Sequence, residues 1–208
     1  MAKTTVRRHA ERGRYDPVSA YEILDEALIC HVAFTDDNNV YNIPMIPVRI
    51  NCDLYLHTSI KSRFYQVVSS GTKVCVTSTL VDGLVLAKSA YNSSMNYRSV
   101  MLFGTMVPVI DPVEKMTVSE KLTEKIAKGR WNDCRLPNER ELKSTGILKM
   151  TIKEFSVKIR SGPPVDESGD HSLPHWSGVI PLMVCHGNPV TSPIDDGKRE
   201  PPDYLTPS

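Results

Sequence analysis

A short segment rich in hydroxyls and cations is the part of the sequence best suited to chemistry. Residues 54–64 read LYLHTSIKSRF, so a strand-like run ends near Ser59 and leads into a helix-like run. Such a junction presents backbone N–H groups without acceptors, and here the Ser62 hydroxyl and the cations of Lys61 and Arg63 stand beside them. These groups favour a phosphate dianion, because N–H donors, the helix dipole and a guanidinium all stabilise negative charge. The alternative is an ordinary helix cap with solvated cations.

The histidines offer further chemistry, and for each one a structural role is the alternative. His57 lies between apolar residues just before the basic segment, where it could bond a cofactor, contact a substrate or ligate an iron. We interpret His31 as structural, and His175 as either a substrate contact or a solvated loop residue. The sequence holds no His-Glu-x-x-His or comparable spacing, and we therefore predict no metal site.

The elements that position these residues are predicted to be mainly strands. Alternating apolar and polar residues, with turn residues between the runs, predict strands at 28–34, 40–50, 54–58, 73–80, 84–90, 97–109 and 148–160. Capping residues and apolar spacing predict helices at 17–27, 60–69, 111–129 and 137–143. About seven strands with few helices predict a mainly β fold, an antiparallel barrel of six to seven strands rather than a doubly wound sheet.

Local signals indicate how these elements begin and connect. Asp16 followed by Pro17, like the Asp-Pro pair at 111–112, is typical of a helix start. Ser59 is expected to cap the second helix, and the Asp-Gly pair at 82–83 predicts a tight hairpin turn.

Composition is that of one globular domain. Of the 208 residues, 40% are hydrophobic and 24% charged, and we assign residues 1–185 to the domain. Residues 186–208 contain five prolines and little apolar content, so we expect a mobile or surface-draped tail.

The net charge of +1 favours neither nucleic acid nor a membrane as partner, and no window is apolar enough for a membrane span. Five cysteines without a paired spacing predict reduced, mostly buried thiols in a cytoplasmic protein.

The basic segment resembles a motif of pyridoxamine 5'-phosphate oxidases and their FMN-binding relatives. Residues 58–64, TSIKSRF, are similar to the Thr-Asn-x-x-Ser-Arg-Lys pattern of that family, with Ser for Asn and Phe for the final Lys. The resemblance implies that Ser62 and Arg63 grip the phosphate of flavin mononucleotide (FMN) and that Lys61 substitutes for the missing lysine. We name residues 58–64 the phosphate turn.

Three further segments resemble the family in the same order along the chain. Residues 44–47, PMIP, occupy the place of the strand whose backbone lines the flavin ring, and Ser99 stands where the family has a glutamine that touches the flavin. Trp176 in PHWSG is similar to a family tryptophan that packs beside the flavin. The cofactor-binding residues that the resemblance implies are Pro44, Met45, Ile46, Pro47, His57, Thr58, Ser59, Lys61, Ser62, Arg63, Ser99 and Trp176.

One part of the sequence departs from the true oxidases. Residues 74–104 and 158–164 most resemble the flavin-nucleotide-binding or Nim-like subgroup. After Trp176 the chain reads SGVIPL and lacks the Arg-x-His that binds the pyridoxal substrate in the oxidases. This difference argues against oxidation of pyridoxamine phosphate.

The resemblance implies a split β-barrel of the FMN-binding type. It also implies an FMN-dependent oxidoreductase of a small flat substrate, with FMN at the interface of a homodimer. In the family, the phosphate turn of one subunit and the tryptophan segment of the other contact the flavin. Segments 74–80 and 101–107 also carry more apolar residues than one monomer core would absorb, which favours an interface. A flavin or haem carrier or sensor without turnover is the alternative, since no acid–base pair stands beside the site. Reduction of nitro compounds is one form of the first hypothesis.

Overall fold

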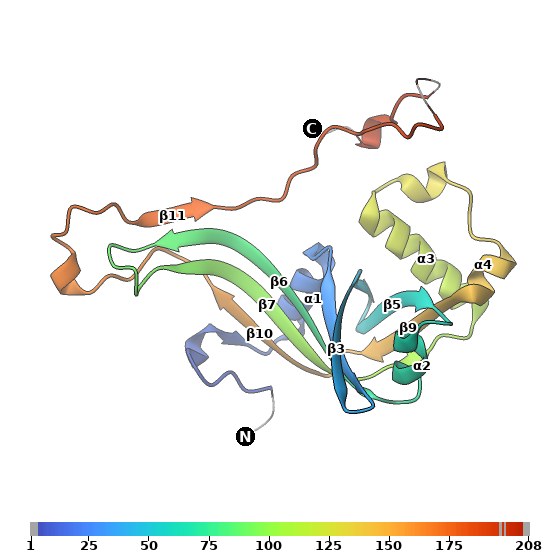
Figure 1. The fold of residues 1–208 in the computed structure, drawn as a ribbon, viewed down its shortest axis with the longest axis horizontal. Coiled ribbons are helices and arrows are strands. Elements are labelled where there is room, and N and C mark those ends of the chain that lie inside the picture. The colour runs from blue at the N-terminus through green and yellow to red at the C-terminus, as the bar shows by residue number, and fades with distance from the viewer. Residues whose placement is uncertain (1–3, 196, 198, 206–208) are drawn as a thin grey trace.

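The chain folds into two antiparallel sheets that share one core (Figure 1). The computed structural model describes residues 4–195, 197 and 199–205. The larger sheet has the order β1-β10-β7-β6-β2-β3 with β11 also paired to β6, and the smaller has the order β4-β5-β9-β8. The strands are β1 (Gly13–Arg14), β2 (Cys30–Asp36), β3 (Asn39–Met45), β4 (Val48–Ile50), β5 (Asp53–Ser59), β6 (Lys73–Leu86), β7 (Ser94–Thr105), β8 (Val107–Pro108), β9 (Thr145–Thr151), β10 (Glu154–Arg160) and β11 (Gly178–Pro181). The α-helices are α1 (Pro17–Glu26), α2 (Arg63–Val68), α3 (Pro112–Ile126) and α4 (Glu139–Ser144), and the 3-10 helices are η1 (Ala10–Arg12), η2 (Arg130–Asp133), η3 (Ser168–Asp170) and η4 (Asp203–Leu205).

The main core lies between the two sheets and α1. Alternation along each strand turns one face inward, so Val32 of β2, Leu56 of β5 and Leu102 of β7 are buried in the same cluster. The opposite face of β5 belongs to a smaller cluster, in which Tyr55 packs with Val118 of α3. Because β5 is buried on both faces, it is a rigid support for the phosphate turn, which begins at its penultimate residue.

The two Asp-Pro pairs begin helices as predicted. Asp16 accepts a hydrogen bond from the N–H of Ser19 at 2.8 Å ahead of α1, and Asp111 accepts one from a backbone N–H of α3 at 3.0 Å. α3 ends at Ile126 rather than at Gly129, whose φ of +93° instead begins η2.

The predicted hairpin turn at Asp82-Gly83 is wrong. β6 runs without interruption through this pair and is paired with β7 along its length. The register shifts between Val81 and Gly83, so the Asp-Gly pair forms a bulge instead of a turn. Pairing with β7 on one side and β11 on the other holds the dipeptide extended, and these long-range hydrogen bonds override its local turn preference.

Three strands predicted as continuous are each divided between the sheets. The segment 97–109 becomes β7 in the larger sheet and β8 in the smaller. The segment 40–50 becomes β3 in the larger sheet and β4 in the smaller, with Pro47, which has no N–H, at the break. The segment 148–160 divides in the same way into β9 and β10, and at this break Ile152 donates its N–H to the carbonyl oxygen of Cys52 at 2.8 Å. Apolar alternation continues on both halves, so the pattern alone does not reveal the change of sheet.

The C-terminal part contains one strand that the sequence does not predict. β11 pairs antiparallel with β6, and Leu182 then donates its N–H to the carbonyl oxygen of Asp82 at 3.1 Å. The chain then leaves the sheet and returns beside η2, where the Tyr204 hydroxyl donates to Oδ2 of Asp133 at 2.8 Å (Figure 1). Of the predicted tail 186–208, residues 196, 198 and 206–208 lie outside the described residues.

Three general features of the described residues bear on the sequence expectations. Their helices include none with the length and apolar content to cross a membrane. They hold no cluster of three or more His, Cys, Asp or Glu side chains suited to a metal ion. All five cysteines are free, but only Cys30 is buried, so the prediction of mostly buried thiols is wrong. Burial raises the pKa of the Cys30 thiol to about 12.

Candidate functional site

The phosphate turn is a strand end joined to a short helix. β5 ends at Ser59, and the N-cap of α2 is Ser62, so the prediction that Ser59 caps this helix is wrong. The Ser62 hydroxyl accepts from the N–H of Tyr65 at 3.1 Å and from the Thr58 hydroxyl at 3.0 Å. The first N–H groups of α2 have no acceptor within the helix. The turn therefore offers backbone donors to an anion.

Two cations flank these donors. Lys61 is exposed, and its side chain forms no ion pair with the described residues. The Arg63 guanidinium lies 4.9 Å from the centre of the Tyr41 ring, and its Nε lies 3.6 Å from Oδ2 of Asp36. Because 60% of the Arg63 side chain is exposed, both cations are accessible to a ligand.

The segment 44–47 carries the chain from one sheet to the other beside the phosphate turn. Its first two residues end β3, and its last two form the link to β4. β4 pairs antiparallel with β5, with Val48 opposite Tyr55, so the residues before Val48 lie toward the Thr58 end of β5. The structure thus places this backbone next to the turn.

His57 is adjacent to Thr58 in sequence but faces the other side of β5. It pairs with Ile147 of β9, which belongs to the smaller core beneath α3. Burial lowers the pKa of His57, and its Nδ1 is buried without a hydrogen-bond partner among the described residues. The structure therefore separates the His57 ring from the Thr58 and Ser62 hydroxyls.

Ser99 and Trp176 lie on other parts of the large sheet. Ser99 is in the middle of β7, with its Oγ 3.0 Å from Oγ1 of Thr79 on the neighbouring β6. Trp176 is 64% exposed and precedes Gly178, which pairs with Leu86 at the end of β6.

The phosphate turn lies near the opposite end of β6. Arg63 contacts Asp36 at the end of β2, and β2 runs beside the first part of β6 with Ala33 opposite Cys75. β6 has 14 residues and spans roughly 40 Å at about 3.3 Å per residue. Trp176 is therefore too far away to contact a ligand held by the phosphate turn of its own chain.

A large cavity lies beside β6, and it was not predicted from the sequence. Its volume is about 1070 Å³. It lies where β6 has no partner on one side, because β2 pairs only with residues 75–77 and β11 only with residues 83–86. Residues 26–31 form the first wall, residues 182–186 form the second wall, and Thr77 and Thr79 form part of the floor.

Two histidines and a methionine line this cavity. His31 belongs to the first wall, and Met183 and His186 belong to the second. Neither imidazole forms a hydrogen bond with the described residues. The two walls are some 150 residues apart in sequence, so no local motif joins them. The one available signal was the apolar block 175–184 within an otherwise polar segment.

The family of the chain follows from a match that includes the phosphate turn. A model of the pyridoxamine 5'-phosphate oxidase family matches residues 16–159. The chain belongs to the pyridoxamine 5'-phosphate oxidase family. This match ends before Trp176 and before the second wall of the cavity. No curated protein sequence is significantly similar to this family member.

Solved structures resemble this pyridoxamine 5'-phosphate oxidase family member over most of its length. The flavocytochrome Anf3 from Azotobacter vinelandii is 30% identical, with a TM-score of 0.90 over 99% of this chain and 95% of that chain. The FAD and haem binding protein from Mycobacterium smegmatis is 28% identical, with a TM-score of 0.88 over 94% of this chain and 98% of that chain. A candidate 5-nitroimidazole antibiotic resistance protein from Bacteroides thetaiotaomicron is 23% identical, with a TM-score of 0.60 over 71% of this chain and 86% of that chain. The predicted mainly β, split-barrel fold is confirmed.

Proposed function

We propose that the protein is an FMN-binding redox protein and that the phosphate turn holds the flavin phosphate. The observation that carries the proposal is the turn itself. In a chain of the pyridoxamine 5'-phosphate oxidase family, it combines unpaired helix N–H groups with two accessible cations. A phosphate dianion is the ligand that this set of donors favours.

Each residue of the turn has a distinct part in this proposal. Arg63 and Lys61 supply positive charge, and the first N–H groups of α2 supply directed donors. Ser62 holds the first turn of α2 through its bond to Tyr65 and is itself fixed by Thr58. The backbone of 44–47 borders the space next to the turn. The bound flavin would supply the hydride and electron chemistry, and the protein would supply binding and orientation.

The second part of the proposal is a homodimer that shares the flavin site. Trp176 is exposed and lies roughly 40 Å from the phosphate turn along β6, so a family-like tryptophan contact requires a second subunit. Exposed apolar side chains on both sheets, such as Met101 of β7 and Val107 of β8, favour the same conclusion. With Trp176 supplied in trans, a small flat substrate would bind beside the flavin at the interface.

We further propose a cytoplasmic location without nucleic-acid or membrane partners. All five cysteines are free, which is usual in a reducing compartment. The net charge of +1 gives no field that would attract a polyanion.

A second candidate function is haem binding in the cavity beside β6, as part of a carrier, sensor or electron-transfer protein. His31, His186 and Met183 are side chains of the kinds that ligate haem iron, and all three line the cavity. Its volume of about 1070 Å³ slightly exceeds the usual range for small-molecule sites, roughly 300–1,000 Å³. Two of the structural matches that extend over nearly the whole chain are a flavocytochrome and an FAD and haem binding protein. The donors therefore fit the group, although Arg98 at the rim is already held by two carboxylates and offers no free cation to its propionates.

The purified protein tests both functions through its absorbance and its extracted cofactors. Flavin bands with FMN identified by mass would support the first proposal, and FAD would correct the cofactor. An intense Soret band would support haem binding. Anaerobic addition of NADH or NADPH then separates a reductase, which bleaches its flavin, from a carrier. A preparation that binds neither flavin nor added haemin would refute both candidates.

A further inference from the structure

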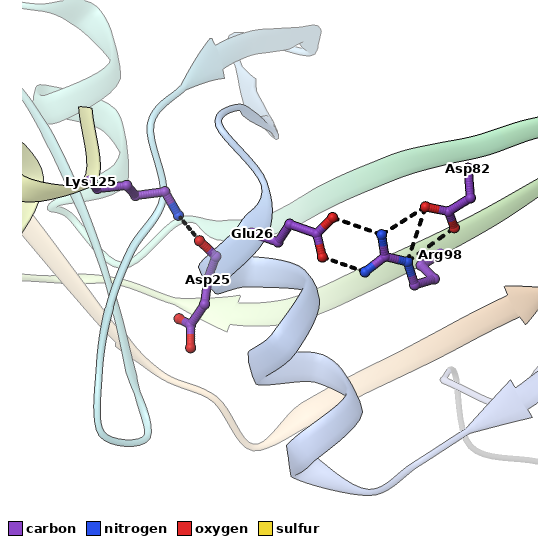
Figure 2. A network of polar contacts seen from close by, with 5 residues as sticks. All are labelled: Asp25, Glu26, Asp82, Arg98 and Lys125. Atoms are coloured by element: carbon purple, nitrogen blue, oxygen red, sulfur yellow. Dashed lines mark hydrogen bonds and ion pairs between the residues drawn. The ribbon is translucent and has the colours of Figure 1, made fainter. Parts of the chain in front are cut away.

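The cavity beside β6 has two walls that are anchored to the protein in different ways. The first wall, residues 26–31, continues directly from α1. At the end of this helix, Nζ of Lys125 in α3 donates to the carbonyl oxygens of Leu24 at 2.6 Å and Asp25 at 3.1 Å. Figure 2 shows the contact between Lys125 and Asp25. Asp25 is also held by Arg49, whose Nε lies 2.9 Å from Oδ1. The first wall is therefore fixed to the body of the protein.

The second wall, residues 182–186, is held much less firmly. It follows the four-residue strand β11, and its first N–H, that of Leu182, is donated to the carbonyl oxygen of Asp82. Beyond this bond the wall is largely open, because the side chains of Met183 and Val184 are 89% and 84% exposed. The position of the second wall therefore depends on where the bulge at Asp82 is held.

Arg98 of β7 joins the two walls. Its Nη1 and Nη2 donate to the Glu26 carboxylate, the second at 2.7 Å, where α1 passes into the first wall. Its Nη2 and Nε donate to the Asp82 carboxylate at 2.7 and 3.0 Å, on the residue whose carbonyl holds the second wall. Figure 2 shows the guanidinium between the two carboxylates. A planar fork is the shape that satisfies two carboxylates at once.

We propose that Arg98 is a positioning residue that holds the two cavity walls at a fixed separation and so sets how tightly a flat ligand binds between them. The inference rests on the second candidate function, a ligand in this cavity. Without the guanidinium, two like-charged carboxylates would face each other and the second wall would lose its tie to the first. Arg98 itself is only 30% exposed, and both of its ion pairs lie at the cavity rim.

The direct test measures the separation of the walls without any ligand. Nitroxide labels are placed on Leu28→Cys of the first wall and on the native Cys185 of the second, in a background with Cys52, Cys75 and Cys134 changed to serine. We expect a narrow distribution of distances between the two labels in this labelled protein, and a broad one when Arg98→Met is added to it. Arg135→Met is the matched control, because Arg135 forms a two-pronged pair with Glu141 and neither residue lines the cavity or holds a wall. A narrow distribution in Arg98→Met would overturn the proposal.

Haemin titration then tests the consequence for binding. The expected result is about a 10-fold weaker haemin affinity in Arg98→Met, the usual scale for removing a supporting contact around a metal site, with no change in Arg135→Met. Arg98→Lys keeps the charge but not the fork, so it should not restore full affinity. If neutralising both carboxylates in Arg98→Met restored affinity, simple charge repulsion would replace the bridge as the explanation and overturn the proposal.

Two further outcomes keep this inference separate from the proposed function. If Arg98→Met does not fold, Glu26→Ala and Asp82→Ala each remove one half of the bridge, and unchanged label distances in both would overturn the inference. If the parent binds no haemin while the label distances still depend on Arg98, the haem function fails and the bridge between the walls stands.

Discussion

Arg63 and Trp176 lie at opposite ends of β6. The guanidinium of Arg63 contacts Asp36 beside the start of this strand, whereas Trp176 precedes the β11 residue that pairs with Leu86 at its end. Two residues that the resemblance to the family assigns to one flavin therefore stand roughly 40 Å apart along a 14-residue strand. Within the proposed function, a complete flavin site needs two chains.

Arg63→Ala is expected to leave a folded protein that purifies largely without flavin. The change removes a charge-assisted contact with the phosphate, which contributes about 1.5–3 kcal/mol. The measurement is the ratio of flavin to protein absorbance. Asp36→Asn is the control, since it removes the ion-pair partner of Arg63 but leaves the cation, and it should retain flavin. Full occupancy in Arg63→Ala would reject the phosphate assignment.

Stability is expected to fall on acidification because of His57. Burial lowers the pKa of His57 below its ordinary 6.5, so below about pH 6.5 the unfolded chain binds more protons than the folded one. The free energy of unfolding should therefore decrease as the pH drops below about 6.5. Above that pH, His57 should contribute no pH dependence to the free energy of unfolding. Urea unfolding at about pH 5.5 and about pH 7.5 measures the difference.

His57→Gln should lose this part of the pH dependence, whereas His31→Gln, with an exposed ring, should keep it. Equal pH dependence in the protein and in His57→Gln would show that His57 does not titrate as its burial indicates.

Gly146→Ala is expected to destabilise the fold and disturb the phosphate turn. A Cβ at this position of β9 would lie 2.4 Å from the Tyr65 ring, and Tyr65 is the residue whose N–H is capped by Ser62. Overpacking of this kind costs about 1–3 kcal/mol, to be measured by urea unfolding. Gly169→Ala is the matched control, because nothing lies within 4 Å of its Cβ. Equal stability of the two variants would contradict the packing of α2 on β9.

The sequence signals that predicted the structure correctly are those whose hydrogen-bond partners lie within a few residues along the chain. The Asp-Pro pairs begin α1 and α3 because each capping carboxylate and the backbone N–H that donates to it are neighbours in sequence. The basic segment after Thr58 likewise forms a strand-to-helix junction. Its cap is Ser62 instead of Ser59, a shift of three residues between two equally suitable hydroxyls.

The larger failures depend on partners far away in the sequence. Asp82-Gly83 is a favourable turn pair, but strands β7 and β11 hold it extended. The changes of sheet at Pro47 and Ile152 keep the same apolar alternation on both sides, so only the three-dimensional partner distinguishes them. The cavity is the clearest case, because its walls come from the two ends of the chain.

Removal of residues 187–208 is expected to change the melting temperature by only a few degrees. The described part of this tail is mostly exposed, and Tyr204 links it to Asp133 through one hydrogen bond. Loss of about 1 kcal/mol corresponds to about 2–4 °C in a protein of this size. Tyr204→Phe should reproduce most of the change in a thermal scan. A much larger shift would show that the tail packs on the barrel or across the dimer.

The central claim, a flavin site shared between two subunits, is tested most directly by a mixed dimer. Subunits carrying Arg63→Ala and Trp176→Ala are coexpressed with different tags, and the heterodimer is isolated and its flavin content measured. Each variant alone has two damaged sites and should be largely flavin-free. In the heterodimer, a shared site combines the intact Arg63 of one subunit with the intact Trp176 of the other. The account predicts flavin at half of the wild-type content, and a heterodimer as empty as either variant alone would contradict it.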